Sequence, residues 1–322
     1  MDRSQARSRL LILTGLLLLC VAADRPRVPI REARWLQSPD VLSDLTTLPP
    51  ECIAWPADKQ QRRMVEVGRA LFRSPLMLGG QAARAGLSCA SCHRNGRTNP
   101  HFHFPGISDE PGTADVTASL MSEHRGDGVF NPKPIPDLGG DPAKLKVKGT
   151  PKLREFIHGL ITQEFDGPEP SPAALDSVVA YVNALGPAAC AGKTDVPITL
   201  AAKLDEVDAA VGLAEKSYAS GDAATGRELL AAARSTLGAI DERFQLMGLE
   251  AARSALRGAD AELFQMQQNW APGPWKAWKR DWPRHKRALE TPARESLFNP
   301  AELARVLAVA NRGSAAASAQ PR

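Results

Sequence analysis

The stretch Cys89-Ala90-Ser91-Cys92-His93 decides what this chain of 322 residues folds around. Two cysteines three positions apart lie on one face of a short helix, so both thiols can reach the same flat ring. The histidine that follows them can place its imidazole under a metal ion held in that ring. This is the C-x-x-C-H attachment sequence of c-type haem. It predicts one covalent haem c, bound through Cys89 and Cys92, with His93 as the proximal iron ligand.

Two other kinds of site use closely spaced cysteines, a zinc site and a redox dithiol. Zinc needs two further ligands nearby, whereas Cys20, Cys52 and Cys190 all lie far from the motif in the sequence. A redox dithiol usually opens a helix after a strand, but the residues before Cys89 have the pattern of a helix followed by a loop. The sequence therefore favours haem.

The N-terminal segment has the pattern of a secretory signal. Three arginines precede the apolar run Leu10–Val21, and the small residues Ala22-Ala23 follow it. We predict a signal peptide over residues 1–23, because the run is shorter than the about 20 apolar residues of a membrane span. An uncleaved membrane anchor is the alternative. Export would place the mature chain in the periplasm, where bacteria attach haem c.

The charge of the chain excludes one class of partner. The formal net charge of +4 falls to about +2 once three Arg and one Asp leave with the signal. This balance gives no indication of nucleic-acid binding.

Two cysteines remain after the signal and the haem motif are set aside. Cys52 precedes the haem segment and Cys190 follows it. An oxidising compartment favours their pairing. A Cys52–Cys190 disulfide would tie together the two ends of one domain, and two buried free thiols are the alternative.

The fold class predicted is mainly α. Residues 24–195 form the first predicted domain, with a helix over about 60–72, the haem motif, a long loop region and a helix that Ser171-Pro172 opens. That order is typical of a cytochrome c-like haem domain.

A second domain is predicted over residues 199–312. Its composition changes to Ala, Leu, Glu and Arg, and apolar residues recur at helical spacing in three successive segments. We expect an α-helical hairpin or bundle there. The tail, residues 313–322, is predicted to be disordered.

Three segments resemble a known family. They are Gly68-Arg69-Ala70-Leu71-Phe72, the run from Gly86 to His93, and Lys148-Gly149-Thr150-Pro151-Lys152-Leu153-Arg154. Their pattern is similar to that of the bacterial dihaem cytochrome c peroxidases and the methylamine-utilisation dihaem enzymes, over about residues 64–186. The resemblance implies a cytochrome c-like fold and haem attachment at Cys89, Cys92 and His93.

The chain departs from that family in having one haem motif instead of two. Dihaem peroxidases use one haem to store an electron and the other to meet peroxide. We therefore expect a periplasmic monohaem c-type cytochrome that carries single electrons between redox protein partners. The alternatives are a peroxidase-like oxidoreductase acting on peroxide, or a haem-containing binding or scaffold protein, so whether the chain is an enzyme stays open.

The sixth iron ligand would decide between electron transfer and ligand chemistry. His158 is the first candidate, because it comes about a dozen residues before the last helix of the haem domain. The alternatives are His103 or its neighbour His101, Met121, His124, and an open coordination position.

The stretch 270–287 interleaves four tryptophans with six basic residues. One hypothesis is a docking surface for a protein partner or for a membrane face. The other is that the tryptophans pack on the helical bundle while the basic ends reach water.

Overall fold

The computed structural model describes residues 28–117, 120–122 and 128–318, with side chains described as far as residue 312. The predicted signal peptide and His124 lie outside the described residues. The chain is mainly helical, and Pro29–Ala304 form one compact unit. No helix in the described part is long and apolar enough to cross a membrane.

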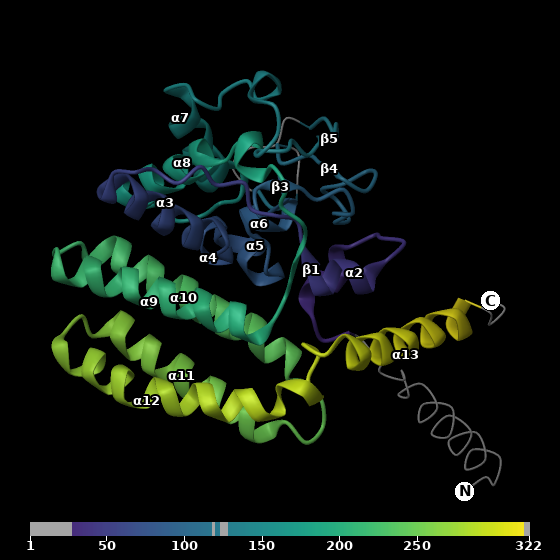
Figure 1. The fold of residues 1–322 in the computed structure, drawn as a ribbon. Helices are drawn as coiled ribbons and strands as arrows, with labels where there is room; N and C mark the ends of the chain where they lie inside the picture. The colour runs from purple at the N-terminus through teal and green to yellow at the C-terminus, as the bar shows by residue number, and fades with distance from the viewer. Residues whose placement is uncertain (1–27, 118–119, 123–127, 319–322) are drawn as a thin grey trace, which may run out of the picture. The chain divides into compact units, whose positions relative to one another are not determined.

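The first half of this unit surrounds the C-x-x-C-H motif with helices and short turns (Figure 1). Its helices and helical turns are η1 (Arg31–Trp35), α2 (Val41–Thr46), α3 (Lys59–Phe72), α4 (Pro75–Leu78), α5 (Gly80–Ala85), α6 (Cys89–Cys92), η2 (Pro142–Lys144), α7 (Lys152–Gly159), the π-helical turn η3 (Leu160–Glu164), α8 (Pro172–Ala184) and η4 (Pro187–Cys190).

Strands are short in the described residues, and each pairs antiparallel with a single partner. The pairs are β1 (Thr47–Leu48) with β6 (Val196–Pro197), β2 (His93–Arg94) with β3 (Arg97–Thr98), and β4 (Thr113–Ala114) with β5 (Lys133–Pro134). In the second pair, His93 faces Thr98 across the ladder.

The helices α3 and α8 form the packed centre of this half. Each begins at a residue whose side chain accepts a backbone N–H, Asp58 from Gln61 at 2.8 Å and Ser171 from Ala174 at 3.3 Å. Pro172 follows Ser171 at the first helical position, as the sequence predicts.

The second half consists of two helical hairpins. Its elements are α9 (Leu200–Ala219), α10 (Ala223–Arg243), α11 (Glu250–Gln268), α12 (Pro272–Glu290) and η5 (Thr291–Glu295). The last helix, α13 (Pro300–Ser318), begins in this unit and continues past its boundary at Ala304. The layer of α9 and α10 contacts α3 on one side, while α11 packs on α10 and α12 on α11 (Figure 1). The predicted periodicity of this half is confirmed for α9, α10 and α11.

At the C-terminus the structure differs from the sequence prediction. The helix α13 continues to Ser318, whereas the tail from Gly313 onward was predicted to be disordered. The run Ala315-Ala316-Ala317 accounts for the difference, because alanine has the highest intrinsic helix propensity.

The tryptophans of α12 belong to the core of the second half. Trp275, Trp278 and Trp282 are each about 5% exposed, and the rings of Trp278 and Trp282 stack with centroids 4.6 Å apart. Trp282 Nε1 donates to Asp208 on α9. These three rings are therefore not available to a docking partner, and burial of their apolar area stabilises the bundle.

Candidate functional site

A cavity of about 380 Å³ lies beside the C-x-x-C-H motif. Most of its wall is apolar, and it is contributed by helices from both sides of the motif in the sequence. The apolar lining side chains are Phe72, Leu78, Ala114, Val116, Pro134, Ile135, Pro136, Leu138, Leu153, Phe156, Ile157, Leu160, Ile161, Phe165, Val178 and Val182. Such a wall suits a flat, apolar ligand.

Both motif cysteines line this cavity as free thiols. Burial raises the pKa of Cys89 and of Cys92 to about 12 in each case. They are neutral thiols at pH 7, placed one helical turn apart on α6.

Hydrogen bonds from outside the motif hold α6 in place. Ser88 N donates to Ser91 Oγ at 3.0 Å at the start of the turn. Asn99, which is 1% exposed, donates from Nδ2 to Ser91 O and from its backbone N to Cys92 O, both at 2.9 Å. The side chain and the backbone of Asn99 thus hold the C-terminal end of the cysteine turn, while Ser88 holds its start.

The backbone carbonyl of Pro136, 43 positions away in the sequence, orients the imidazole ring of His93. Nδ1 lies 3.0 Å from Pro136 O, and since a carbonyl can only accept, Nδ1 carries the proton. Nε2 then keeps its lone pair, which is the arrangement that metal-ligating histidines use. Burial lowers the pKa of His93 to about 4, despite opposing contributions from Pro136 and Asp137. The imidazole is therefore neutral at pH 7 and can donate to a metal ion.

The candidate sixth ligands among the described residues lie outside this lining. His158 does not line the cavity, and its Nε2 is 2.9 Å from both carboxylate oxygens of Glu169. His101 Nδ1 lies 2.7 Å from Asp44 Oδ2. His103 is also absent from the lining, as is Met121, which is 2% exposed and part of the core.

Among the described residues that line the cavity, His93 is the only histidine and there is no methionine. The polar side chains of the lining, apart from those of the motif, are Ser88, Asp115, Thr117, Asn131 and Lys133. Within the described part of the chain, no group of three or more His, Cys, Asp or Glu side chains converges on a metal-sized site.

The disulfide and Lys148 close the first half of the unit. Cys52 and Cys190 form a disulfide with Cα atoms 4.8 Å apart, which joins residues 138 positions apart. Lys148 Nζ donates to Leu138 O in the cavity wall and to Leu185 O at the end of α8. Burial lowers the pKa of Lys148 from its ordinary value. This lysine therefore connects the long loop to α8 in the first half.

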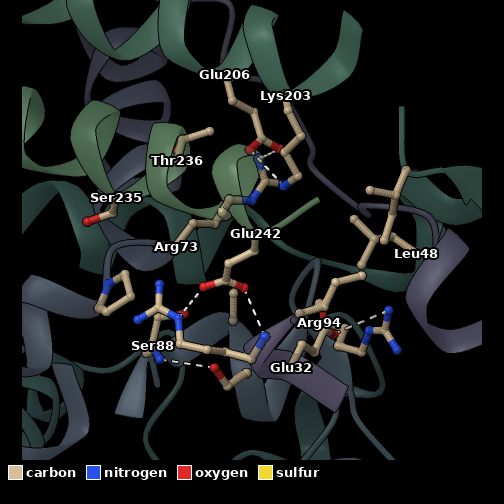
Figure 2. A pocket seen from close by; sticks show the side chains of 18 of the residues that line it. Glu32, Leu48, Arg73, Ser88, Arg94, Lys203, Glu206, Ser235, Thr236 and Glu242 are labelled. Atoms are coloured by element: carbon tan, nitrogen blue, oxygen red, sulfur yellow. Dashed lines mark hydrogen bonds and ion pairs between the residues drawn. The ribbon is translucent and has the colours of Figure 1, made fainter. Parts of the chain in front are cut away.

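A second cavity of about 190 Å³, lined by several charged side chains, lies between the motif segment and the helices α9 and α10 (Figure 2). Arg73 reaches Glu206 at 3.2 Å, and Glu206 also accepts from Lys203 at 2.9 Å. Arg31 pairs with Glu242 on α10.

Arg94, on the same wall, lies 3.3 Å from Asp44 and 3.6 Å from Glu32. Each of these basic side chains thus has a carboxylate beside it. These ion pairs connect the two halves of the unit, because Arg73 and Arg31 lie in the first half and Glu206 and Glu242 in the second.

Sequence reasoning did not find Asn99, Pro136 or the pair Arg97–Asp137. The last is a bidentate ion pair, with Arg97 Nε 2.8 Å from Asp137 Oδ1 and 2.9 Å from Oδ2. Pro136 acts through its backbone carbonyl, which no side-chain pattern reveals. The cluster Pro134-Ile135-Pro136 was the one available signal, since it predicts a rigid, extended segment.

Comparison of this chain with protein-family models, with curated proteins and with solved structures finds no match.

Proposed function

We propose that this chain carries one covalent haem c and relays single electrons between redox protein partners in the periplasm. The observation that carries the proposal is the contact of His93 Nδ1 with Pro136 O at 3.0 Å, within a cavity whose wall also holds two free thiols. This contact leaves Nε2 as the donor atom for iron.

The residues of the cavity fit such a group. Cys89 and Cys92 would hold it through two thioether bonds, and His93 would be the proximal ligand. Side chains such as Leu153, Ile157 and Val182 would exclude water from its faces. When bound, haem supplies a one-electron iron couple, and the chain supplies orientation and an apolar environment.

Attachment is tested on the chain purified from the periplasm of a host that matures haem c. Denaturing electrophoresis followed by haem staining is expected to give a stained band, and acid–acetone is expected to leave the haem on the protein. The double variant Cys89→Ala with Cys92→Ala should abolish the stain because it removes both sulfurs. Release of haem from the unsubstituted chain would contradict the proposal.

A matched control lies between the two cysteines. Ala90→Ser changes a variable position of the motif, so its stain should equal that of the unsubstituted chain. His93→Ala keeps both thiols but removes the imidazole. We expect it to retain some stain while its iron spectrum changes, which separates attachment from ligation.

One observation favours a second function, ligand or peroxide binding at an exchangeable iron position. The described lining residues other than His93 offer neither a histidine nor a methionine. Carbon monoxide added to the reduced protein, or peroxide added to the oxidised protein, distinguishes the two functions. An unchanged spectrum supports the electron carrier, whereas a carbon monoxide complex or a rapid high-valent species supports the second function.

A further inference from the structure

The segment that carries Pro136 is held against the hairpin of β2 and β3 at three points. Thr98 Oγ1 donates to Ile135 O, and Gly139 N donates to Gly96 O at 3.1 Å. Between these two contacts, Arg97 forms its bidentate ion pair with Asp137. The carbonyl that orients His93 is thus positioned by the residues that directly follow His93 in the chain.

Arg97 also contacts the disulfide. Its Nη1 lies 3.3 Å from Cys52 Sγ and 3.6 Å from Cys190 Sγ, while Nη2 lies 2.8 Å from Asp137 Oδ2. One guanidinium therefore connects the Cys52–Cys190 disulfide to the segment beside His93. Side chains of both ion-pair partners are about 30% exposed, so solvent screens the pair only in part.

Asp137 directly follows Pro136 in the sequence, so its charge acts close to the imidazole of His93. That carboxylate raises the pKa of His93, against the larger lowering effect of burial. A negative charge near the Nδ1 proton increases electron donation from Nε2, whereas the cation of Arg97 offsets it. Lys148, which donates to Leu138 O, is the further charged group in contact with this segment.

We propose that Arg97 is a positioning residue for the proximal imidazole and that the Arg97–Asp137 pair sets the reduction potential of the iron. The inference rests on the proposed haem attachment through Cys89, Cys92 and His93. Stronger donation from the imidazole stabilises the ferric state and lowers the potential, and weaker donation raises it. The two partners of the pair therefore act with opposite sign.

The test compares midpoint potentials of full-length variants by spectroelectrochemical titration, after haem content has been measured for each. Arg97→Gln leaves Asp137 unpaired, so its potential should fall. Asp137→Asn leaves the cation unpaired, so its potential should rise. The double variant should shift less than either single variant, and Arg97→Lys should lie closer to the unsubstituted chain than Arg97→Gln.

Arg253→Gln is the matched control. Arg253 forms a bidentate pair with Asp241 in the second half, at 2.9 and 3.0 Å and with similar exposure. Loss of the Arg253–Asp241 pair should leave the reduction potential of the iron unchanged.

Equal potentials in Arg97→Gln, Asp137→Asn and the unsubstituted chain, at equal haem content, would overturn the inference. Shifts of the same sign in both variants would overturn it too, since a merely structural role predicts no sign reversal. If Arg97→Gln does not fold, Arg97→Lys and Asp137→Asn decide the outcome. An unsubstituted chain without covalent haem would instead overturn the proposed function, and that result is read before any potential is measured.

Discussion

Gly68 in α3 lies directly against the backbone carbonyl of Ser177 in α8. A Cβ atom at position 68 would fall 1.9 Å from Ser177 O and 2.9 Å from Tyr181 Cβ. Both obstacles are parts of a packed helix that cannot rotate away. Glycine at this position is therefore what permits the two central helices of the first half to cross.

Gly68→Ala should lower the free energy of unfolding by about 3 kcal/mol, because the extra methyl group forces α3 and α8 apart. Denaturant unfolding of the purified chain measures this change. Gly238→Ala in α10 is the control, since a Cβ there meets nothing within 4 Å. That substitution should stabilise the chain by about 0.5–1 kcal/mol through helix propensity. A Gly68→Ala variant as stable as the control would contradict the crossing geometry.

The disulfide should be the strongest single constraint on the unfolded chain. It joins Cys52 to Cys190 across 138 positions. Closing so long a loop lowers the entropy of the unfolded chain, which stabilises the fold by about 4–5 kcal/mol. Replacing both cysteines by alanine should lower the free energy of unfolding by about that amount. Peptide mapping without reductant should recover the two segments linked, and free-thiol labelling of both cysteines would contradict the bond.

Glu51 should make the stability of the chain depend on acid pH. It accepts from Arg69 at 2.7 Å, from Arg73 at 3.1 Å and from Tyr181 OH at 2.7 Å. Burial raises the pKa of Glu51, but the two guanidinium groups outweigh burial and lower it below 4.5. A carboxyl whose pKa is lower in the folded state stabilises the fold above its unfolded pKa.

This stabilisation should be lost as the pH falls from about 4.5 through the folded pKa. Glu51→Gln should lower the free energy of unfolding at pH 7 by about 3 kcal/mol and flatten its pH dependence in that range. Unfolding curves between pH 3 and pH 7 measure both effects. A variant with the same pH dependence as the unsubstituted chain would assign the acid sensitivity to another group.

His158 lies outside the cavity lining, so its substitution should not affect the iron of the proposed haem. Its Nε2 is paired with Glu169 outside the cavity lining. If the proposed haem is bound, His158→Ala should therefore leave its ferric spectrum and the response to cyanide unchanged. The same holds for the control His101→Ala, whose imidazole pairs with Asp44. A low-spin spectrum that becomes high-spin in His158→Ala alone would restore His158 as the sixth ligand.

In the stretch 270–287, composition alone does not distinguish between two structural interpretations. Alternating tryptophans and basic residues fit a docking surface as well as a packed helix, because both need one apolar and one charged face. The structure buries Trp275, Trp278 and Trp282 and leaves Lys276 and Arg287 exposed. Which face finds a partner depends on the neighbouring helices α9 and α11, and no local pattern encodes those contacts.

Structural features that depend on interactions between residues close in the sequence could be predicted from the sequence by itself. The spacing of Cys89 and Cys92 places both thiols on one helical turn, and Asp58 and Ser171 begin their helices through bonds to residues three positions later. The period of apolar residues likewise determined the helices of the second half. Such interactions span a few residues, so their geometry follows from the backbone of a single element.

Only the tertiary structure decided how the candidate site is supported. Pro136 O meets His93 across 43 positions, and Arg97 meets Cys190 across 93. His158 faces Glu169 instead of the cavity because of the direction in which α7 packs. Contacts over such separations depend on how whole elements pack, and a backbone carbonyl such as that of Pro136 acts whatever side chain accompanies it.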